Sequence, residues 1–230
     1  MKITTGDKKS EGMARRQFLQ YAGTGTALFA AALIASCSKD NSKQNIYNDH
    51  VDLGTGDVAI LNYAYALEQL EAAFYTQVVA SPYTSISAYE KSVLTDIRDH
   101  EVSHREFFKT ALAGIAIPKL TIDFSSINFA DRTSVLAAAK SFEDLGVSAY
   151  NGAGYMIKDA SYLAVASKIA SVEARHASLI RNLIAVGSFA DNTVIDTNGL
   201  DIAQSPQQVI PVVNTFISVK KILAPAFGIY

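Results

Sequence analysis

Cysteine is almost absent from this sequence, in which Cys37 is the only one among 230 residues. A single cysteine excludes an internal disulfide framework and the clustered thiolates that zinc and iron–sulfur sites use. An excess of basic charge is also missing, since 20 lysines and arginines stand against 22 aspartates and glutamates. Without a basic stripe there is no reason to expect a nucleic-acid partner. Any metal site must therefore use oxygen and imidazole ligands.

A long hydrophobic run is lacking as well, because the apolar stretch over residues 21–35 is too short for a comfortable membrane span. It follows the pair Arg15-Arg16 and leads into Cys37. This order is similar to a twin-arginine export signal ending in a lipobox, in which Cys37 would be lipidated. An ordinary N-terminal membrane anchor is the alternative. We expect residues 1–37 to be a signal peptide and the protein to be exported, as a periplasmic or cell-surface lipoprotein anchored to a membrane.

The remaining residues, in a chain that is 49% hydrophobic, suffice for one globular domain with accessory segments. Residues 38–55 are the predicted tether. Apolar residues then recur in steps of three and four, which predicts helices over residues 56–80, 86–114, 134–158 and 161–186. Asp57 and Thr133 are the expected N-caps of the first and third helices. Residues 116–133 lack this period, and so long a connection in an antiparallel bundle indicates a crossover along its length.

The C-terminal extension, residues 188–230, is less regular. Residues 206–219 predict a short helix interrupted by Pro211. The tail that follows is apolar, and exposing Ile222, Leu223, Phe227 and Tyr230 together would create a sticky patch. We therefore expect the extension to dock on the bundle.

Each predicted helix places one glutamate in its apolar seam. The four residues are Glu68, Glu101, Glu143 and Glu173. In the second and fourth helices a histidine follows three residues later, His104 and His176, on the same helical face. The glutamates of the first pair lie 33 positions apart and those of the second pair 30, so the chain reads as one helical hairpin used twice.

Taken singly, a helical glutamate is usually solvated and a histidine on an apolar face is usually a hydrogen-bonded core residue. These ordinary interpretations fail when the six residues are taken together, because burying even one unpaired charge costs several kcal/mol. Four carboxylates facing one interior would cost more or would have to be held protonated. Two divalent cations would cancel four negative charges and would use both imidazoles. The pattern therefore predicts a dinuclear metal site.

Four segments resemble the ferritin-like superfamily, in particular exported ferritin-like domain proteins related to plant desiccation-associated proteins. They are residues 67–75, 100–104, 142–150 and 173–176. The resemblance covers residues 55–187. It implies an all-α fold: a ferritin-like antiparallel four-helix bundle over residues 56–187, with a long crossover between helices two and three and with the C-terminal extension.

The resemblance also implies roles for the six residues. Glu101 and Glu173 would bridge two metals, Glu68 and Glu143 would be terminal ligands, and His104 and His176 would each bind one metal. Glu71 competes with Glu68 and is otherwise expected beside the site or as an alternative ligand. Tyr75, two turns after Glu68, is expected to orient a ligand or donate an electron, or else to be a core tyrosine. His100 is expected at the surface.

The cofactors implied are two divalent ions of iron or manganese. Haem is not expected, because Val102 stands where bacterioferritin-like proteins carry the haem-binding methionine. The resemblance suggests an oxidoreductase of the ferroxidase, peroxidase or catalase type, acting on dioxygen or peroxide. The alternative is a non-catalytic lipoprotein that protects against stress or desiccation and in which the metals are structural. The reaction, its catalytic residues and a homo-oligomeric state stay open.

Overall fold

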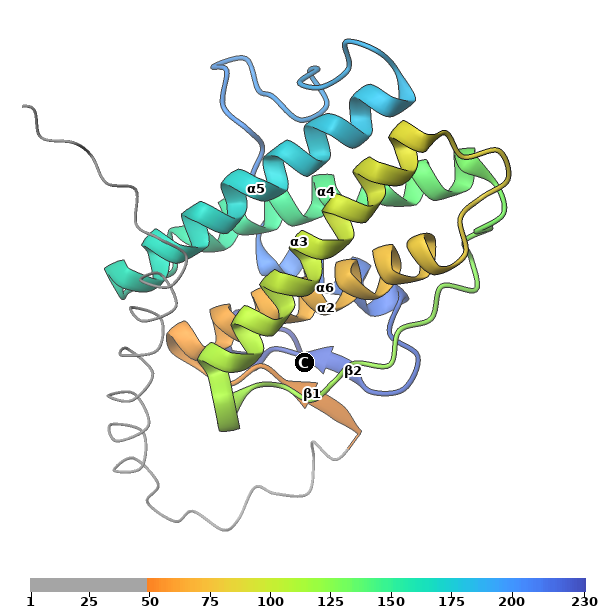
Figure 1. The fold of residues 1–230 in the computed structure, drawn as a ribbon. Coiled ribbons are helices and arrows are strands. Elements are labelled where there is room, and N and C mark those ends of the chain that lie inside the picture. Colours follow the sequence, from red (N-terminus) through yellow and green to blue (C-terminus); the bar gives the residue numbers. More distant parts are fainter. Residues whose placement is uncertain (1–48) are drawn as a thin grey trace, which may run out of the picture. The chain divides into compact units, whose positions relative to one another are not determined.

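The computed structural model describes residues 49–230. The predicted signal peptide, Cys37 and most of the predicted tether lie outside the described residues. Figure 1 shows four long helices: α2 (Gly56–Ala80), α3 (Ala88–Leu112), α4 (Arg132–Gly154) and α5 (Ala160–Ile184). The shorter elements are β1 (His50–Asp52), η2 (Ala113–Ile115), α6 (Pro206–Thr215), β2 (Lys221–Leu223) and η3 (Pro225–Phe227). The predicted all-α four-helix bundle is confirmed. None of the helices in this part of the chain has both the length and the hydrophobicity of a membrane span.

The four helices pair as two hairpins, α2 with α3 and α4 with α5, and α2 and α4 also meet between the hairpins. Local caps explain where helix ends differ from the prediction. α3 begins two residues later than predicted, after a capping box in which Ser87 and Glu90 bind each other's amides. α4 begins two residues earlier, because Asp131 and not the predicted Thr133 is its cap. The Asp131 carboxylate accepts a hydrogen bond from the Ser134 amide at 2.8 Å.

Asp57, the predicted cap of α2, instead binds the turn between α4 and α5. Thr55 is the N-cap residue of α2, without a side-chain hydrogen bond. The two Asp57 carboxylate oxygens accept hydrogen bonds from the amides of Lys158 (3.0 Å) and Asp159 (2.8 Å). These bonds satisfy the turn's amides outside a helix, so α4 ends at Gly154 and not at the predicted Lys158.

The connection between α3 and α4 crosses the length of the bundle, as predicted (Figure 1). Two buried polar residues of α2 hold its first part. The Asn62 side chain donates a hydrogen bond to the Ile115 carbonyl (3.0 Å) and accepts one from the Ile117 amide (2.9 Å). The Gln69 side-chain carbonyl accepts a hydrogen bond from the Leu120 amide at 2.8 Å. These bonds offset the desolvation of the two amides and of the crossing backbone.

The two ends of the described chain meet in a small parallel pair, β1 with β2. Val51 and Leu53 fall within the predicted tether, yet both are buried in the folded unit. Ile222 and Phe227 of the apolar tail are buried in the same core, whereas Tyr230 is 85% exposed. Most of the tail's hydrophobic surface is thus covered by packing, which is the physical reason it docks.

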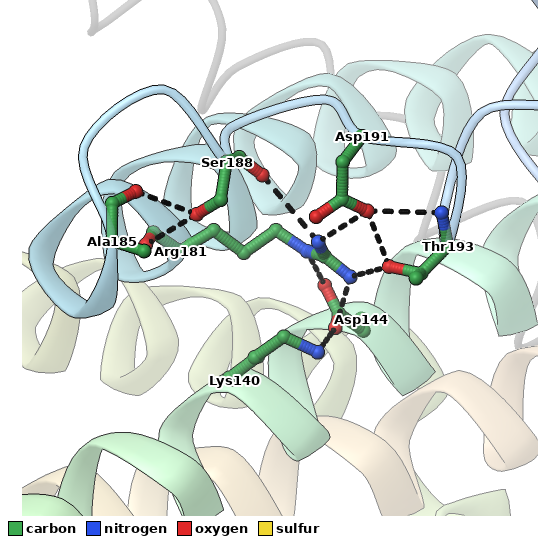
Figure 2. A network of polar contacts seen from close by, with 7 residues as sticks. All are labelled: Lys140, Asp144, Arg181, Ala185, Ser188, Asp191 and Thr193. Atoms are coloured by element: carbon green, nitrogen blue, oxygen red, sulfur yellow. Dashed lines mark hydrogen bonds and ion pairs between the residues drawn. The ribbon is translucent and has the colours of Figure 1, made fainter.

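A buried arginine on α5 ties the extension to the bundle (Figure 2). The Arg181 side chain is 2% exposed, and its Nε and Nη2 bind both oxygens of Asp144 on α4, at 2.7 and 2.9 Å. Nη1 lies 3.1 Å from the Asp191 carboxylate and donates to the Ser188 carbonyl, while Nη2 also donates to the Thr193 hydroxyl. Each nitrogen of the guanidinium has an oxygen partner. The free-energy cost of burying the charge is therefore offset by the two aspartates and by hydrogen bonds to the residues that follow α5.

Candidate metal centre

One glutamate from each long helix reaches the middle of the bundle. Glu68 on α2, Glu101 on α3, Glu143 on α4 and Glu173 on α5 are all fully buried, at 0% exposure. Their seams lead into the same core, because residues in steps of three and four share one helical face. The structure therefore brings together the four carboxylates that the sequence singles out.

His104 meets three of these carboxylates through one ring nitrogen. Its Nδ1 lies 2.8 Å from Glu173 Oε1, 3.4 Å from Glu68 Oε2 and 3.8 Å from Glu101 Oε2. None of these approaches has the geometry of a hydrogen bond, so Nδ1 is buried without a hydrogen-bond partner. The nitrogen thus faces a point among three oxygens rather than one oxygen, as an imidazole ligand of a cation does.

His176 repeats this arrangement in the other half of the site. Its Nδ1 lies 2.8 Å from Glu101 Oε1, 3.4 Å from Glu173 Oε2 and 3.6 Å from Glu143 Oε2. Glu101 and Glu173 therefore each turn one oxygen toward His104 and the other toward His176. In each of the two resulting groups the ligand atoms lie within 4.8 Å of one another.

The chemistry of the donor set fits a cation in each of the two groups. Both oxygens of Glu101 and of Glu173, and one oxygen each of Glu68 and Glu143, are buried without a hydrogen-bond partner. Among the ion pairs of residues 49–230, only the two histidines approach these carboxylates. Unpaired buried oxygens facing one another are strongly unfavourable. A divalent ion in each group would supply the missing partner.

The electrostatics of the metal-free site point the same way. Burial and neighbouring carboxylates raise the pKa of Glu68 to about 8, and burial raises the pKa of Glu143 well above its usual range. Burial also opposes ionisation of Glu101, but contacts with both histidines outweigh it and lower the pKa to about 2. Burial opposes charge on the histidines, yet the carboxylates raise the pKa of His104 to about 12 and of His176 to about 10. Without metal, protons must hold this interior together.

Two tyrosines bind the outer glutamates in a reciprocal manner. The Tyr75 hydroxyl on α2 donates a 2.6 Å hydrogen bond to Glu143 Oε1 on α4, so Tyr75 lies beside the site. The Tyr150 hydroxyl on α4 donates a short hydrogen bond to Glu68 Oε1 on α2. Sequence reasoning missed Tyr150, although a signal was present: it follows Glu143 by seven residues, as Tyr75 follows Glu68.

Glu71 lies next to the centre but belongs to neither group of converging ligand atoms. It is 2% exposed, and burial together with the neighbouring carboxylates raises its pKa well above the usual range. Its carboxylate fills the space above Gly146, where a side chain's Cβ would lie 2.8 Å from Glu71 Oε1. Gly146 is also the position in the second hairpin that matches Glu71 in the first, since each lies three residues after its glutamate. The core therefore holds Glu71 as a fifth carboxylate from the first hairpin, and the matching position of the second hairpin is a glycine.

His100 is exposed, as expected, but it also contacts the site. Its Nδ1 lies 2.9 Å from Nε2 of His176, the ring nitrogen that faces away from the carboxylates. Sequence reasoning placed His100 only relative to Glu101. The overlooked signal is its position four residues before His104, which puts both histidines on one face of α3.

Oxygen-rich sites with two imidazoles suit iron and manganese. The six converging residues also lie within the match to a known protein family. A family model described as a ferritin-like domain matches residues 56–186, more than half of the chain. The match spans all four long helices and includes all six of the converging residues. A search of curated proteins gives no match. With its four-helix bundle and its buried carboxylate and histidine cluster, the chain belongs to the ferritin-like domain family.

Proposed function

We propose that the chain binds two divalent ions, iron or manganese, and that the loaded centre oxidises ferrous iron or consumes peroxide. The observation that carries this proposal is the sharing of Glu101 and Glu173 between two ligand groups. Each of these carboxylates has one oxygen in either group, which is what a bridging ligand requires. Glu68 with His104, and Glu143 with His176, would complete the two positions.

The chain's own residues would hold and shield this centre. Tyr75 and Tyr150 orient the two terminal carboxylates by hydrogen bonds from the opposite hairpin, which restricts their rotation. The buried seams exclude bulk water, so charge changes inside them are strongly felt. Iron or manganese bound here would supply electrons by cycling between divalent and trivalent states, which is the chemistry that dioxygen and peroxide need.

The test begins with the full chain, purified in detergent and freed of metal. It is loaded with ferrous or manganous ion without air, and metal per chain is measured after gel filtration. Peroxide consumption and ferrous oxidation under air follow. We expect two ions per chain and turnover of at least one substrate. Fewer than about one ion per chain after loading would overturn the proposed site.

Two variants test the roles of the shared carboxylates. Glu101→Ala and Glu173→Ala should each abolish binding of both ions, because either carboxylate serves both positions. Glu71→Gln is the matched control, since it changes an equally buried carboxylate outside both groups and should leave two ions bound. Retention of both ions by a bridging variant would contradict the assignment. Full occupancy without turnover would favour the alternative, a protective lipoprotein in which the metals are structural.

We also propose that the protein is exported and held at a membrane by lipid on Cys37. The order of the arginine pair, the apolar stretch and the lone cysteine supports this. Cys37→Ala should move the protein from the membrane fraction to the soluble one. Replacing Arg15 and Arg16 by lysine should stop export. The chain that still carries its signal peptide should then accumulate inside the cell. Membrane attachment that survives Cys37→Ala would favour an ordinary N-terminal anchor.

A further inference from the structure

His176 uses its two ring nitrogens for different partners. Nδ1 faces the carboxylates of Glu101, Glu143 and Glu173, while Nε2 lies 2.9 Å from Nδ1 of His100. The rings of His100 and His176 are almost parallel, with an angle of 11° between their planes and 5.1 Å between their centroids. An exposed imidazole of α3 therefore covers the outer side of a buried imidazole of α5.

The direction of this hydrogen bond follows from the role of Nδ1. An imidazole that offers the Nδ1 lone pair to a cation must carry its proton on Nε2. That proton needs an acceptor, and Nδ1 of His100 is within reach. His100 must then carry its own proton on Nε2, which the exposure of His100 lets it share with water. The pair thus has one consistent proton arrangement when His176 is a ligand.

The two halves of the site differ in this respect. The position that corresponds to His100 in the second hairpin, four residues before the ligand histidine, is Val172, whose side chain cannot accept a hydrogen bond. Within residues 49–230 the ion-pair contacts of His104 all run through Nδ1. In the described part of the chain, the residue at the place of His100 on the His104 side is therefore not a histidine, although the ligands themselves are nearly symmetric.

We propose that His100 is a positioning residue that holds His176 in its metal-binding tautomer and makes the metal position of His176 the tighter of the two. The proposal rests on the proposed dinuclear site. Partners that bind the outer N–H of a ligand histidine fix its ring and raise its basicity, and losing one typically weakens metal binding about 10- to 100-fold. Here the partner is an imidazole rather than a carboxylate or a backbone carbonyl.

The test compares Co²⁺ binding by the metal-free full chain and three variants. His100→Ala removes the acceptor, whereas His100→Asn keeps an acceptor close to the place of Nδ1. Ser103→Ala is the control, because Ser103 is exposed on the same helix and its hydroxyl binds the Asp99 carbonyl of that helix. Stepwise binding is followed by absorption, and circular dichroism and thermal unfolding of the metal-free proteins check that each variant folds.

We expect the wild type to bind two Co²⁺ with unequal affinity. His100→Ala should weaken the tighter step about 10- to 100-fold and leave the other within a few-fold. His100→Asn and Ser103→Ala should stay close to the wild type. In NMR spectra of the Co²⁺ form, a hyperfine-shifted exchangeable proton on His176 Nε2 should be visible in the wild type and exchange too fast to see in His100→Ala. A purely structural role would not move this signal.

The outcomes separate the two proposals. If the wild type binds two ions and His100→Ala binds them equally well, or loses both steps equally, the role of His100 is overturned and the dinuclear site stands. If His100→Asn is as weak as His100→Ala, the hydrogen bond is not the cause and the proposal also fails. If the wild type binds no Co²⁺, Fe²⁺ or Mn²⁺, the proposed site itself fails and the role of His100 fails with it.

Discussion

Metal loading at neutral pH should release about four protons for two ions bound, because the cations displace the protons that hold the metal-free site. His104 and His176 contribute one each, since their pKa values of about 12 and about 10 keep both protonated at pH 7. Glu68, with a pKa of about 8, and Glu143, with a pKa well above its usual range, contribute the other two. Four protons leave and four positive charges enter, so the charge of the interior hardly changes.

The direction of the pH dependence follows from these shifts. In the metal-free protein the pKa values of the two histidines are raised from 6.5, so the stability they contribute is complete below pH 6.5 and is lost toward pH 10 to 12. The pKa of Glu68 is raised from 4.5, so its contribution is lost between about pH 4.5 and 8. Metal binding changes in the opposite direction, because fewer protons compete as pH rises. The stability gained from metal should therefore grow with pH.

Two measurements check this prediction. Titration of unbuffered metal-free protein with Mn²⁺ in a pH-stat counts released protons directly. The product of the two association constants, measured from pH 6 to 7, should rise by about four powers of ten per pH unit. Glu68→Gln is the internal control, because it removes one of the four protons and should release about three. Release of fewer than about two protons by the wild type would refute this account of the interior.

Two further predictions concern packing and the buried arginine. Gly146→Ala should destabilise the protein by about 1–3 kcal/mol in urea unfolding, because the added methyl group overlaps the buried carboxylate of Glu71. In a Glu71→Ala background the same change should stabilise by about 0.5–1 kcal/mol, since alanine is favoured over glycine inside a helix; equal effects in both backgrounds would contradict the overlap. Arg181→Met should cost about 1.5–3 kcal/mol, because it removes the charge-assisted hydrogen bonds of a buried guanidinium, although Asp144 keeps its ion pair with Lys140. Lys140→Met, which removes a more exposed partner of the same aspartate, should cost less than about 1 kcal/mol; similar losses would show that burial of the pair is not what matters.

Much of the bundle could be predicted from the sequence because its helices are long and periodic. The predicted segment 56–80 coincides with α2, and the other three helices begin and end within four residues of the predicted positions. The errors have local causes, such as Asp57, whose carboxylate binds a turn about a hundred residues away instead of its own helix. A capping residue and a long-range acceptor look alike in sequence, because both are aspartates near a helix start.

The candidate site, like the bundle, could be predicted from the sequence only in part. The sequence by itself determined that Glu68, Glu101, Glu143 and Glu173 occupy apolar seams and that two histidines follow at one helical turn. From this the expected metal site follows, because buried carboxylates need cations or protons as partners. That argument depends on composition and periodicity, which are local properties of the chain.

Only the tertiary structure decided which atoms meet. The pairing of Tyr150 with Glu68, the space that Gly146 leaves for Glu71 and the contact of His100 with His176 all join different helices. Such contacts depend on how far each helix is rotated and shifted against its neighbour, and a difference of one residue turns a side chain by about 100°. The sequence spacing places a residue on a face of its own helix, but the packing of all four helices sets what that face touches.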